Sequence, residues 1–482
     1  MKITSSEADS LIKENLLNDD ALAINNVLLK IKIEKDKDSG FSSNFDSSLD
    51  DSDKWNNLSD NLINEREIFI TKCRQEFSSK LPEQFDRWTL KQQYDHLMSN
   101  IRKYFPNIPE SLRFIMPAVF ENGDCSRRRG NAKPDWLIMD KFYRGQRFAE
   151  RYFSGILIGT LMGLIQIFSF SDGIKPLILS QKSDTPYKAF ERYLRTVRIL
   201  RNWYTSDPWC EGTPAYRDIQ RVRRLHSAMR SKLSKKSFKE IDEDSKIQNV
   251  WCPILGKITK DFADTCSIAK SQHCPYLIAR TTSLNQGEMA GTMFACISLT
   301  VLYPEQFGIF NASDEDLEAF CHLWRGLGYL LGMEDQYNFC RGDLQDVRRR
   351  SKDFIEQWIK PNFRTVTSEW EHIIMCLHES VVYMDILSNY KVSLLYLCDI
   401  FELNMPRLYG LFSLREKIIY MLHKFLFCYM MKLPGIISIV NKVINTCLDR
   451  AATFKSVKHD ELKKKSFKQI QEFVPLKFDY TV

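Results

Sequence analysis

Apolar residues recur at steps of three and four along most of this chain, whereas the strict alternation of a half-buried strand is rare. A spacing of three to four residues places apolar side chains on one face of an α-helix. Glycine and proline, at 19 and 16 residues, interrupt the pattern seldom. The pattern therefore predicts an all-α protein with a large helical domain.

The polar pattern divides the chain into three regions. Residues 1–60 carry 13 acidic and 7 basic side chains, and their second half is rich in Ser and Asp, so we expect a disordered acidic tail. Residues 61–345 form the predicted helical domain. Residues 346–482 hold further helical segments and are expected to be a C-terminal helical extension.

Two predicted helices in the middle of the chain carry the most informative polar residues. The first runs from Lys188 to Tyr204, and the second begins near Ala215 after a loop that contains two prolines. In the first helix, Arg192 and Arg195 share a face with Thr196, which lies four residues after Arg192. The apolar stripe of the second helix is Ile219, Val222, His226, Met229 and Leu233.

His226 interrupts an otherwise apolar stripe, and two interpretations fit it. A histidine in such a place is commonly a core residue that bonds a carbonyl group. Alternatively, a neutral imidazole held by a rigid helix in an apolar setting is suited to ligate haem iron. Spacing alone leaves both interpretations open.

The pattern Arg192-x-x-Arg195-Thr196, followed by His226 within RVRRLHSAMR, resembles the central motif of a known family. This is the family of rubber oxygenases (latex clearing proteins) and MpaB-type, endoplasmic-reticulum-bound oxygenases. Three flanking stretches resemble the same family in the same order, and the resemblance covers about 130–335. The stretches are 134–153 with its Pro-x-Trp and Arg-Gly, 284–299, and 313–335 with its Trp-Arg and Gly-x-x-x-Gly.

The resemblance implies an all-helical domain over 61–345 whose globin-like core holds haem b. His226 would be the iron ligand, and Arg192 and Thr196 would hold the cofactor region. Arg195 would be the distal or gating residue. The implied activity is that of a haem-dependent oxygenase that brings O₂ to an apolar small molecule, unsaturated ones included.

Two departures from the rubber-cleaving members narrow this expectation. Arg195 stands where those members have a lysine, and an arginine cannot exchange a proton as a lysine can. They also use an upstream glutamate as a base, whereas 171–191 offers only Asp172, Asp184 and Glu191, none at the corresponding position. The resemblance therefore does not predict polyisoprene cleavage and leaves the substrate open.

Two apolar stretches are candidates for membrane contact. Residues 152–170 approach the length of a span, but the polar side chains within them favour a buried core helix. The glycines Gly155, Gly159 and Gly163 would allow close approach of another helix or of a flat cofactor. Residues 415–444 contain two lysines and a Pro-Gly break, so they fit a helix at a membrane interface or one packed on the core.

Composition separates the remaining alternatives. The 13 cysteines form no C-x-x-C pair, and Cys266, His273 and Cys274 lack a second pair at zinc spacing, so we expect reduced thiols in an intracellular protein. No signal peptide is evident, and the expected location is the cytoplasm or the endoplasmic-reticulum membrane surface.

The net charge of +7 and the basic segment 217–239 come without a nucleic-acid-binding motif, so no nucleic-acid partner is expected. A non-catalytic helical scaffold, docked on membranes through 415–444, is the main alternative to the oxygenase.

Overall fold

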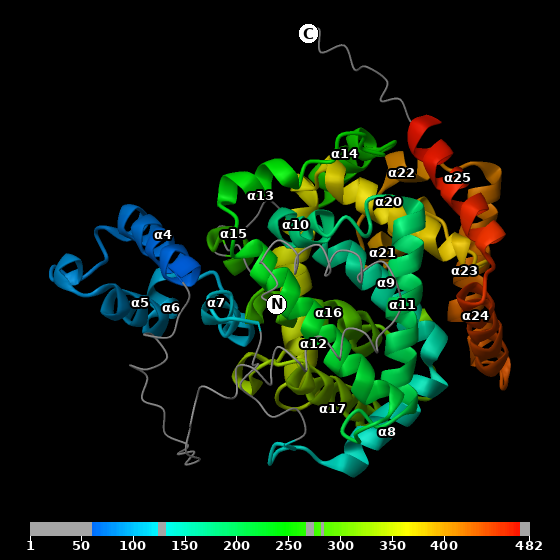
Figure 1. Cartoon of the computed structure of the whole chain (residues 1–482), viewed down its shortest axis with the longest axis horizontal. Helices are drawn as coiled ribbons and strands as arrows, with labels where there is room; N and C mark the ends of the chain where they lie inside the picture. Colours follow the sequence, from blue (N-terminus) through cyan, green and yellow to red (C-terminus); the bar gives the residue numbers. More distant parts are fainter. Residues whose placement is uncertain (1–59, 124–131, 267–273, 281–283, 473–482) are drawn as a thin grey trace, which may run out of the picture. The chain divides into compact units, whose positions relative to one another are not determined.

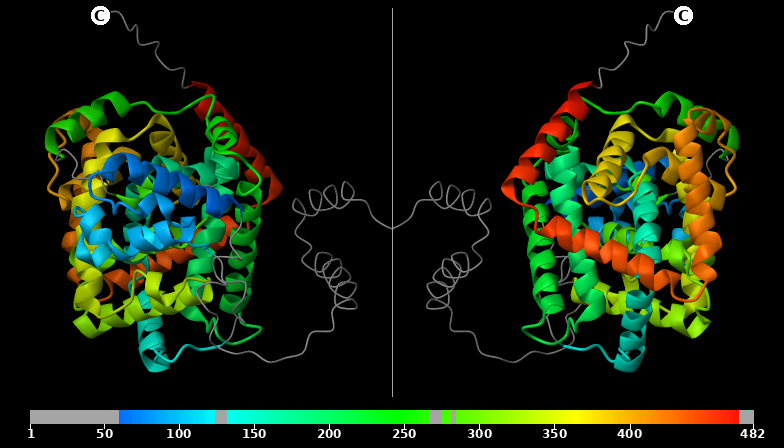
Figure 2. Two further views of the ribbon diagram at one scale, coloured as in Figure 1. Left: turned by 90° about the vertical axis from the view of Figure 1, so that its left-hand side faces the viewer. Right: turned by 90° about the vertical axis from the view of Figure 1, so that its right-hand side faces the viewer.

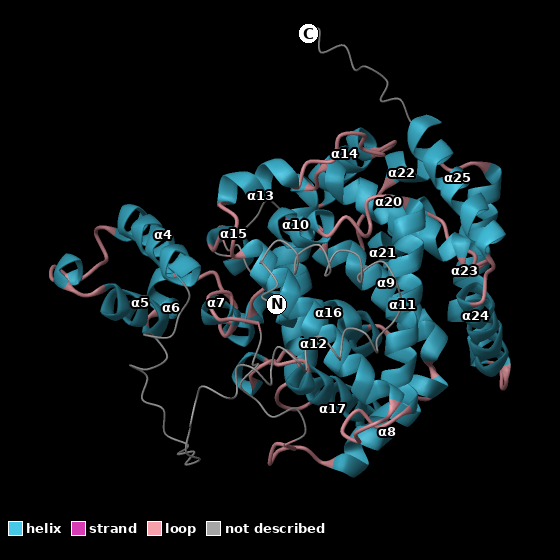
Figure 3. Ribbon diagram, viewed as in Figure 1, coloured by secondary structure: helices cyan, strands magenta, loops and turns pink. Residues whose placement is uncertain are grey.

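The computed structural model describes residues 60–123, 132–266, 274–280 and 284–472. Within these ranges every regular element is a helix, and the β-type pairing is one isolated bridge between Asn122 and Asn285 (Figure 3). The predicted all-α fold is confirmed. The predicted acidic tail, 1–60, lies outside the described residues except for Asp60, with which the first described helix begins.

The helices up to residue 302 are α4 (Asp60–Phe77), α5 (Leu90–Ser99), α6 (Ile101–Tyr104), α7 (Ile115–Ala118), α8 (Met139–Arg151), α9 (Phe153–Ile167), α10 (Ser171–Leu179), α11 (Pro186–Thr205), α12 (Pro214–Leu233), α13 (Phe238–Asp244), α14 (Leu255–Thr265), α15 (Pro275–Ile278) and α16 (Gln286–Leu302). The helices that follow are α17 (Asp314–Leu330), α18 (Leu344–Phe354), α19 (Lys360–Asn362), α20 (Ser368–Tyr383), α21 (Tyr390–Ile400), α22 (Pro406–Gly410), α23 (Leu414–Cys428), α24 (Ile436–Ala452) and α25 (Ser456–Glu472).

Local sequence signals explain where the principal helices begin and end. Thr185 and Thr213 cap α11 and α12 with their hydroxyl groups, and each is followed by a proline at the first helical position. Ser313 and Asp316 form a capping box at the start of α17. Just past the end of α17, Gly332 adopts a φ of 98°, which suits a glycine cap.

Three helix pairs form the centre of the described fold: α8 with α17, α9 with α16, and α11 with α20 (Figure 1). Residues 59–482 are grouped into one compact unit by their contacts. The described helices after residue 345 pack on the earlier ones, because α20 lies along α11 and α24 also contacts α9. The boundary at residue 345 stays a prediction.

The glycines of α9 serve helix packing. A Cβ added at Gly163 would overlap the carbonyl group of Ala295 on α16, and one added at Gly155 would overlap the carbonyl oxygen of Phe307. Close approach of another backbone, one of the two uses predicted for these glycines, is therefore observed at Gly155 and Gly163. The predicted buried core helix over 152–170 is observed as α9, in which most residues are buried.

Gly163→Ala is expected to lower the free energy of unfolding by about 3 kcal/mol, because the new methyl group would force two helix backbones apart. Thermal or urea unfolding of the full chain measures the change. Gly256→Ala on α14 is the matched control, since a Cβ there meets nothing within 4 Å. That control should be neutral or stabilising by up to about 1 kcal/mol, and equal losses in both variants would contradict the packing role.

No single helix within the described ranges is long and apolar enough to cross a bilayer. The pair α8 and α9 meets the length and composition criteria together, but its two members are bent by 88°.

Candidate functional site

The helices α11 and α12 form an antiparallel hairpin, and their bounds confirm the two helices predicted from sequence. Side chains hold its closed end together. Asn202 donates a hydrogen bond to the Asp218 carboxylate at 2.8 Å, and the Ser206 hydroxyl accepts one from the Ala215 N–H at 3.0 Å. The hairpin is therefore a rigid support for the residues along it.

The three motif residues of α11 lie on one side of the helix. Arg192 is half-buried and donates to the Ser183 hydroxyl at 3.3 Å, whereas Arg195 and Thr196 are exposed. The Thr196 hydroxyl donates to the Arg192 carbonyl oxygen at 3.0 Å. Its proton is thus used within the helix, and only its oxygen lone pairs are left for another group.

The stripe predicted for α12 is buried at its ends and half-buried in its middle. Ile219 and Leu233 are inaccessible to solvent or nearly so, whereas Val222, His226 and Met229 are only half-buried. His226 thus occupies the least enclosed part of a rigid apolar stripe.

Two histidines within the described residues, His372 and His322, are buried more deeply than His226. Both ring nitrogens of His372 are used: Nδ1 accepts from the Trp251 N–H at 2.8 Å, and Nε2 bonds the Asp184 carbonyl at 2.9 Å. His322 Nε2 accepts from the Ile138 N–H at 3.0 Å. His372 and His322 are core histidines that bond the backbone, and burial lowers the pKa of both.

A group of cations gathers beside the hairpin around Lys182, in the loop before α11. Partial burial lowers the pKa of the Lys182 ammonium, and four neighbouring positive charges lower it further. The four are Arg195, Arg192, Arg221 and Lys232. We call Lys182 and these four residues the cationic cluster.

The cationic cluster is not neutralised by the described part of the chain. None of its five members forms an ion pair with a described carboxylate, and the ammonium of Lys232 instead donates to the Leu179 carbonyl oxygen at 2.9 Å. Like charges held together repel each other, so such a group is best stabilised by an anion. Sequence reasoning singled out Arg192 and Arg195 but missed Lys182, because no local pattern links it to α12.

The α12 members of the cluster and His226 lie on different faces of the same helix. Arg221 precedes His226 by five residues and Lys232 follows it by six, which at 100° per residue places both cations on one face, about 120–140° around the helix from His226. The charges of both lower the pKa of Lys182, so Lys182 lies toward the face of α12 that carries the cations. An anionic group held by the cluster would lie along the same turns of α12 as His226, on a different face.

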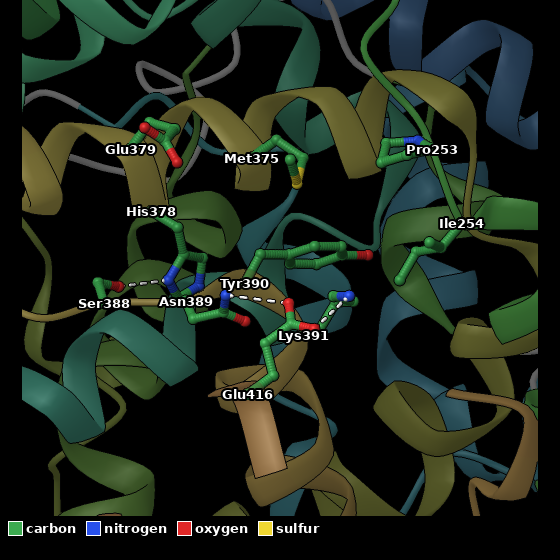
Figure 4. Close-up of a pocket in the computed structure, with 10 residues that line it drawn as sticks. All are labelled: Pro253, Ile254, Met375, His378, Glu379, Ser388, Asn389, Tyr390, Lys391 and Glu416. Carbon is green, nitrogen blue, oxygen red and sulfur yellow. Dashed lines mark hydrogen bonds and ion pairs between the residues drawn. The ribbon is translucent and has the colours of Figure 1, made fainter. Parts of the chain in front are cut away.

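A separate pocket of about 210 Å³ lies where α20, α21 and α23 meet (Figure 4). His378 lines it, with Nδ1 2.7 Å from the Ser388 hydroxyl, and burial lowers the pKa of this imidazole to about 3. Lys391 and Glu416, 2.7 Å apart, neutralise each other on the other side. Apart from Glu379, the other hydrogen-bonding groups of the lining are neutral. Sequence reasoning missed this pocket because its lining spans residues 253 to 416.

Metal ligation from a cluster of side chains is not found in the described ranges, where no group of three or more His, Cys, Asp or Glu side chains could hold an ion. His273, part of the Cys266–Cys274 segment, lies outside those ranges. Haem iron can be held by a single imidazole, so the absence of such a cluster does not bear on His226 as a haem ligand. Nine of the twelve described cysteines are buried, and all twelve are free thiols, as predicted.

Comparisons with protein-family models, with curated proteins and with solved structures gave no match to this chain.

Proposed function

We propose that this chain is a haem b-dependent oxygenase that uses O₂ to oxidise an apolar small molecule, with His226 as the iron ligand. The observation that supports the proposal is the cationic cluster beside α12, the helix that holds His226, because none of its members pairs with a described carboxylate. Haem b carries two propionate carboxylates, and guanidinium and ammonium groups are the usual partners of carboxylates. In the proposal, the cluster would bind the propionates and the half-buried imidazole of His226 would bind the iron.

Each residue of the site has a defined task in this proposal. Bound haem iron would supply the O₂ chemistry. His226 would hold the iron from a helix that is capped and cross-linked at its start. Arg192 and Arg195 would bind carboxylate oxygens, and because a guanidinium keeps its proton, Arg195 would orient charge and not act as a base. Thr196 would accept a hydrogen bond. The apolar substrate class follows from the family resemblance.

Titration of the full chain with haem b tests the proposal. We expect a Soret band that saturates at one haem per chain, and O₂ uptake when the reduced complex meets unsaturated hydrocarbons. A spectrum that shows only the broad absorption of unbound haem, with no sharpened or shifted Soret band, would contradict the proposal and favour the helical scaffold. Haem binding without O₂-dependent product formation would contradict the oxygenase part alone.

Neutralising the cationic cluster should weaken haem binding. Lys182→Gln combined with Arg221→Gln is expected to raise the dissociation constant for haem about tenfold, because two residues that would bind the propionates lose their positive charge. The loss should shrink at high salt. Lys235→Gln, an exposed lysine after α12 that is not part of the cluster, is the matched control and should leave the dissociation constant unchanged. Equal affinities of the double variant and the control would show that the cluster does not hold the cofactor.

A further inference from the structure

Large apolar side chains are exposed mainly on one part of the molecule. Of the 16 large apolar side chains that are exposed among the described residues, 13 lie between residues 387 and 467. Most of these belong to α23, the turn after it and α24, which together with α25 cover one face (Figure 2, right). An exposed apolar patch of this size on a folded chain marks an interaction surface.

The helix α23 turns an apolar stripe to solvent. Its exposed residues are Leu414, Ile418, Met421, Leu422 and Phe425, and Tyr429 continues them past the helix end, with exposed fractions between 44% and 77%. They follow the three- and four-residue spacing that normally faces a protein core. On another face of the helix, Tyr420 and Lys424 bond Asp399 of α21. Polar bonds thus hold the helix to the body while its apolar stripe faces outward.

The same stripe continues across the Pro434-Gly435 break. Leu433 before the break is 51% exposed, and Ile439 and Val443 on α24 are 59% and 56% exposed. Gly435 adopts a φ of 84°, which lets the chain turn between the two helices. Two short helices with outward apolar residues suit a surface on which they lie flat, since neither is long enough to cross a bilayer.

Positive charge surrounds this apolar stripe. Residues 414–444 contain five cations, Arg415, Lys417, Lys424, Lys432 and Lys442, and one acidic residue, Glu416. Glu416 is already paired with Lys391 of α21. Among the described carboxylates only Asp399 pairs with any of the five, through Lys424. The cations on α25 differ, because most of them are paired with carboxylates.

We propose that the face formed by α23 and the first half of α24 docks on an anionic lipid surface. Apolar side chains would enter the boundary between headgroups and acyl chains. The aliphatic part of each lysine side chain would lie along the apolar stripe, and its ammonium group would reach a lipid phosphate. Charge selects this occupant over a second copy of the chain, because a symmetric dimer would bring the uncompensated cations of both copies together. The inference is independent of haem binding.

Flotation of the full chain with lipid vesicles tests the docking face. Vesicles of phosphatidylcholine with about 30% phosphatidylserine should carry the protein to the top of the gradient, and pure phosphatidylcholine should bind it at least about tenfold more weakly. Leu422→Glu combined with Phe425→Glu should reduce binding to the anionic vesicles by more than about tenfold. Both positions are exposed, so helical content should stay unchanged by circular dichroism.

Ile138→Glu is the matched control, because Ile138 is as exposed, at 57%, but lies at the start of α8. Its binding should equal that of the unmodified chain. Absence of binding to anionic vesicles, or equal binding by the double variant, would overturn the proposal. A dimer of the unmodified chain in sedimentation velocity, dissociated by the double variant, would instead identify the face as a self-association surface. Equal binding to neutral vesicles would overturn the requirement for anionic lipid.

Discussion

His226→Ala is expected to abolish the Soret band of the haem-loaded chain or to raise the dissociation constant for haem more than about a hundredfold. The substitution removes the one nitrogen that the proposal assigns to the iron. It should cost little stability, because His226 is only half-buried on α12. Visible absorption spectra of both proteins, recorded during titration with haem b, measure the effect. Free imidazole added to the variant should restore a histidine-like spectrum.

His459→Ala is a suitable control for this experiment. His459 on α25 is also half-buried, but its Nδ1 lies 2.9 Å from the hydroxyl of Tyr187 on α11 and is hydrogen-bonded to it. Its spectrum and affinity should match those of the unmodified chain. An unchanged Soret band in His226→Ala would exclude His226 as the ligand, and an equal loss in both variants would point to a general loss of folding.

Glu371→Gln is expected to stabilise the protein at alkaline pH. The Glu371 side chain is inaccessible to solvent on α20, and burial raises the pKa of its carboxyl group from 4.5 to about 8. The folded state therefore holds the proton more tightly than the unfolded state. The resulting stability is fully present below pH 4.5 and is lost as the pH rises toward about 8. Above that pH the ionised carboxylate costs on the order of 4 kcal/mol, which the neutral glutamine avoids.

Urea unfolding of both proteins at about pH 5 and about pH 9 measures this difference. The free energies of unfolding of the two proteins should be nearly equal at about pH 5 and should differ by several kcal/mol at about pH 9. The glutamine can keep the bond that Glu371 accepts from the Ile254 N–H at 3.0 Å. Glu369→Gln, half-buried on the same helix, should change stability by less than about 0.5 kcal/mol. A pH-independent difference for Glu371→Gln would show that the buried carboxyl does not titrate as described.

Local signals in the sequence were sufficient for the helices that carry the candidate site. Helical spacing predicts α11 and α12 to within about two residues of their observed starts, and apolar spacing predicts the stripe around His226. These features depend on residues within a few positions of each other. The glycines of α9 also indicated close packing, but only the fold shows that the partner is the helix α16.

Contacts between distant segments decided the rest. Lys182 joins the cationic cluster because the loop before α11 meets α12, and the His378 pocket forms because residues 253–254 meet the helices α20, α21 and α23, which follow more than 100 residues later. The depth at which His226 lies depends in the same way on what packs against α12.

The sequence by itself determined that this chain is all-α, where its central hairpin begins, and that one histidine interrupts the apolar stripe there. Only the tertiary structure decided which charges gather beside that hairpin and which face of α23 meets solvent. The physical reason is that periodicity specifies which side chains share a helix face, whereas burial and charge compensation depend on the neighbours which the whole fold brings to that face.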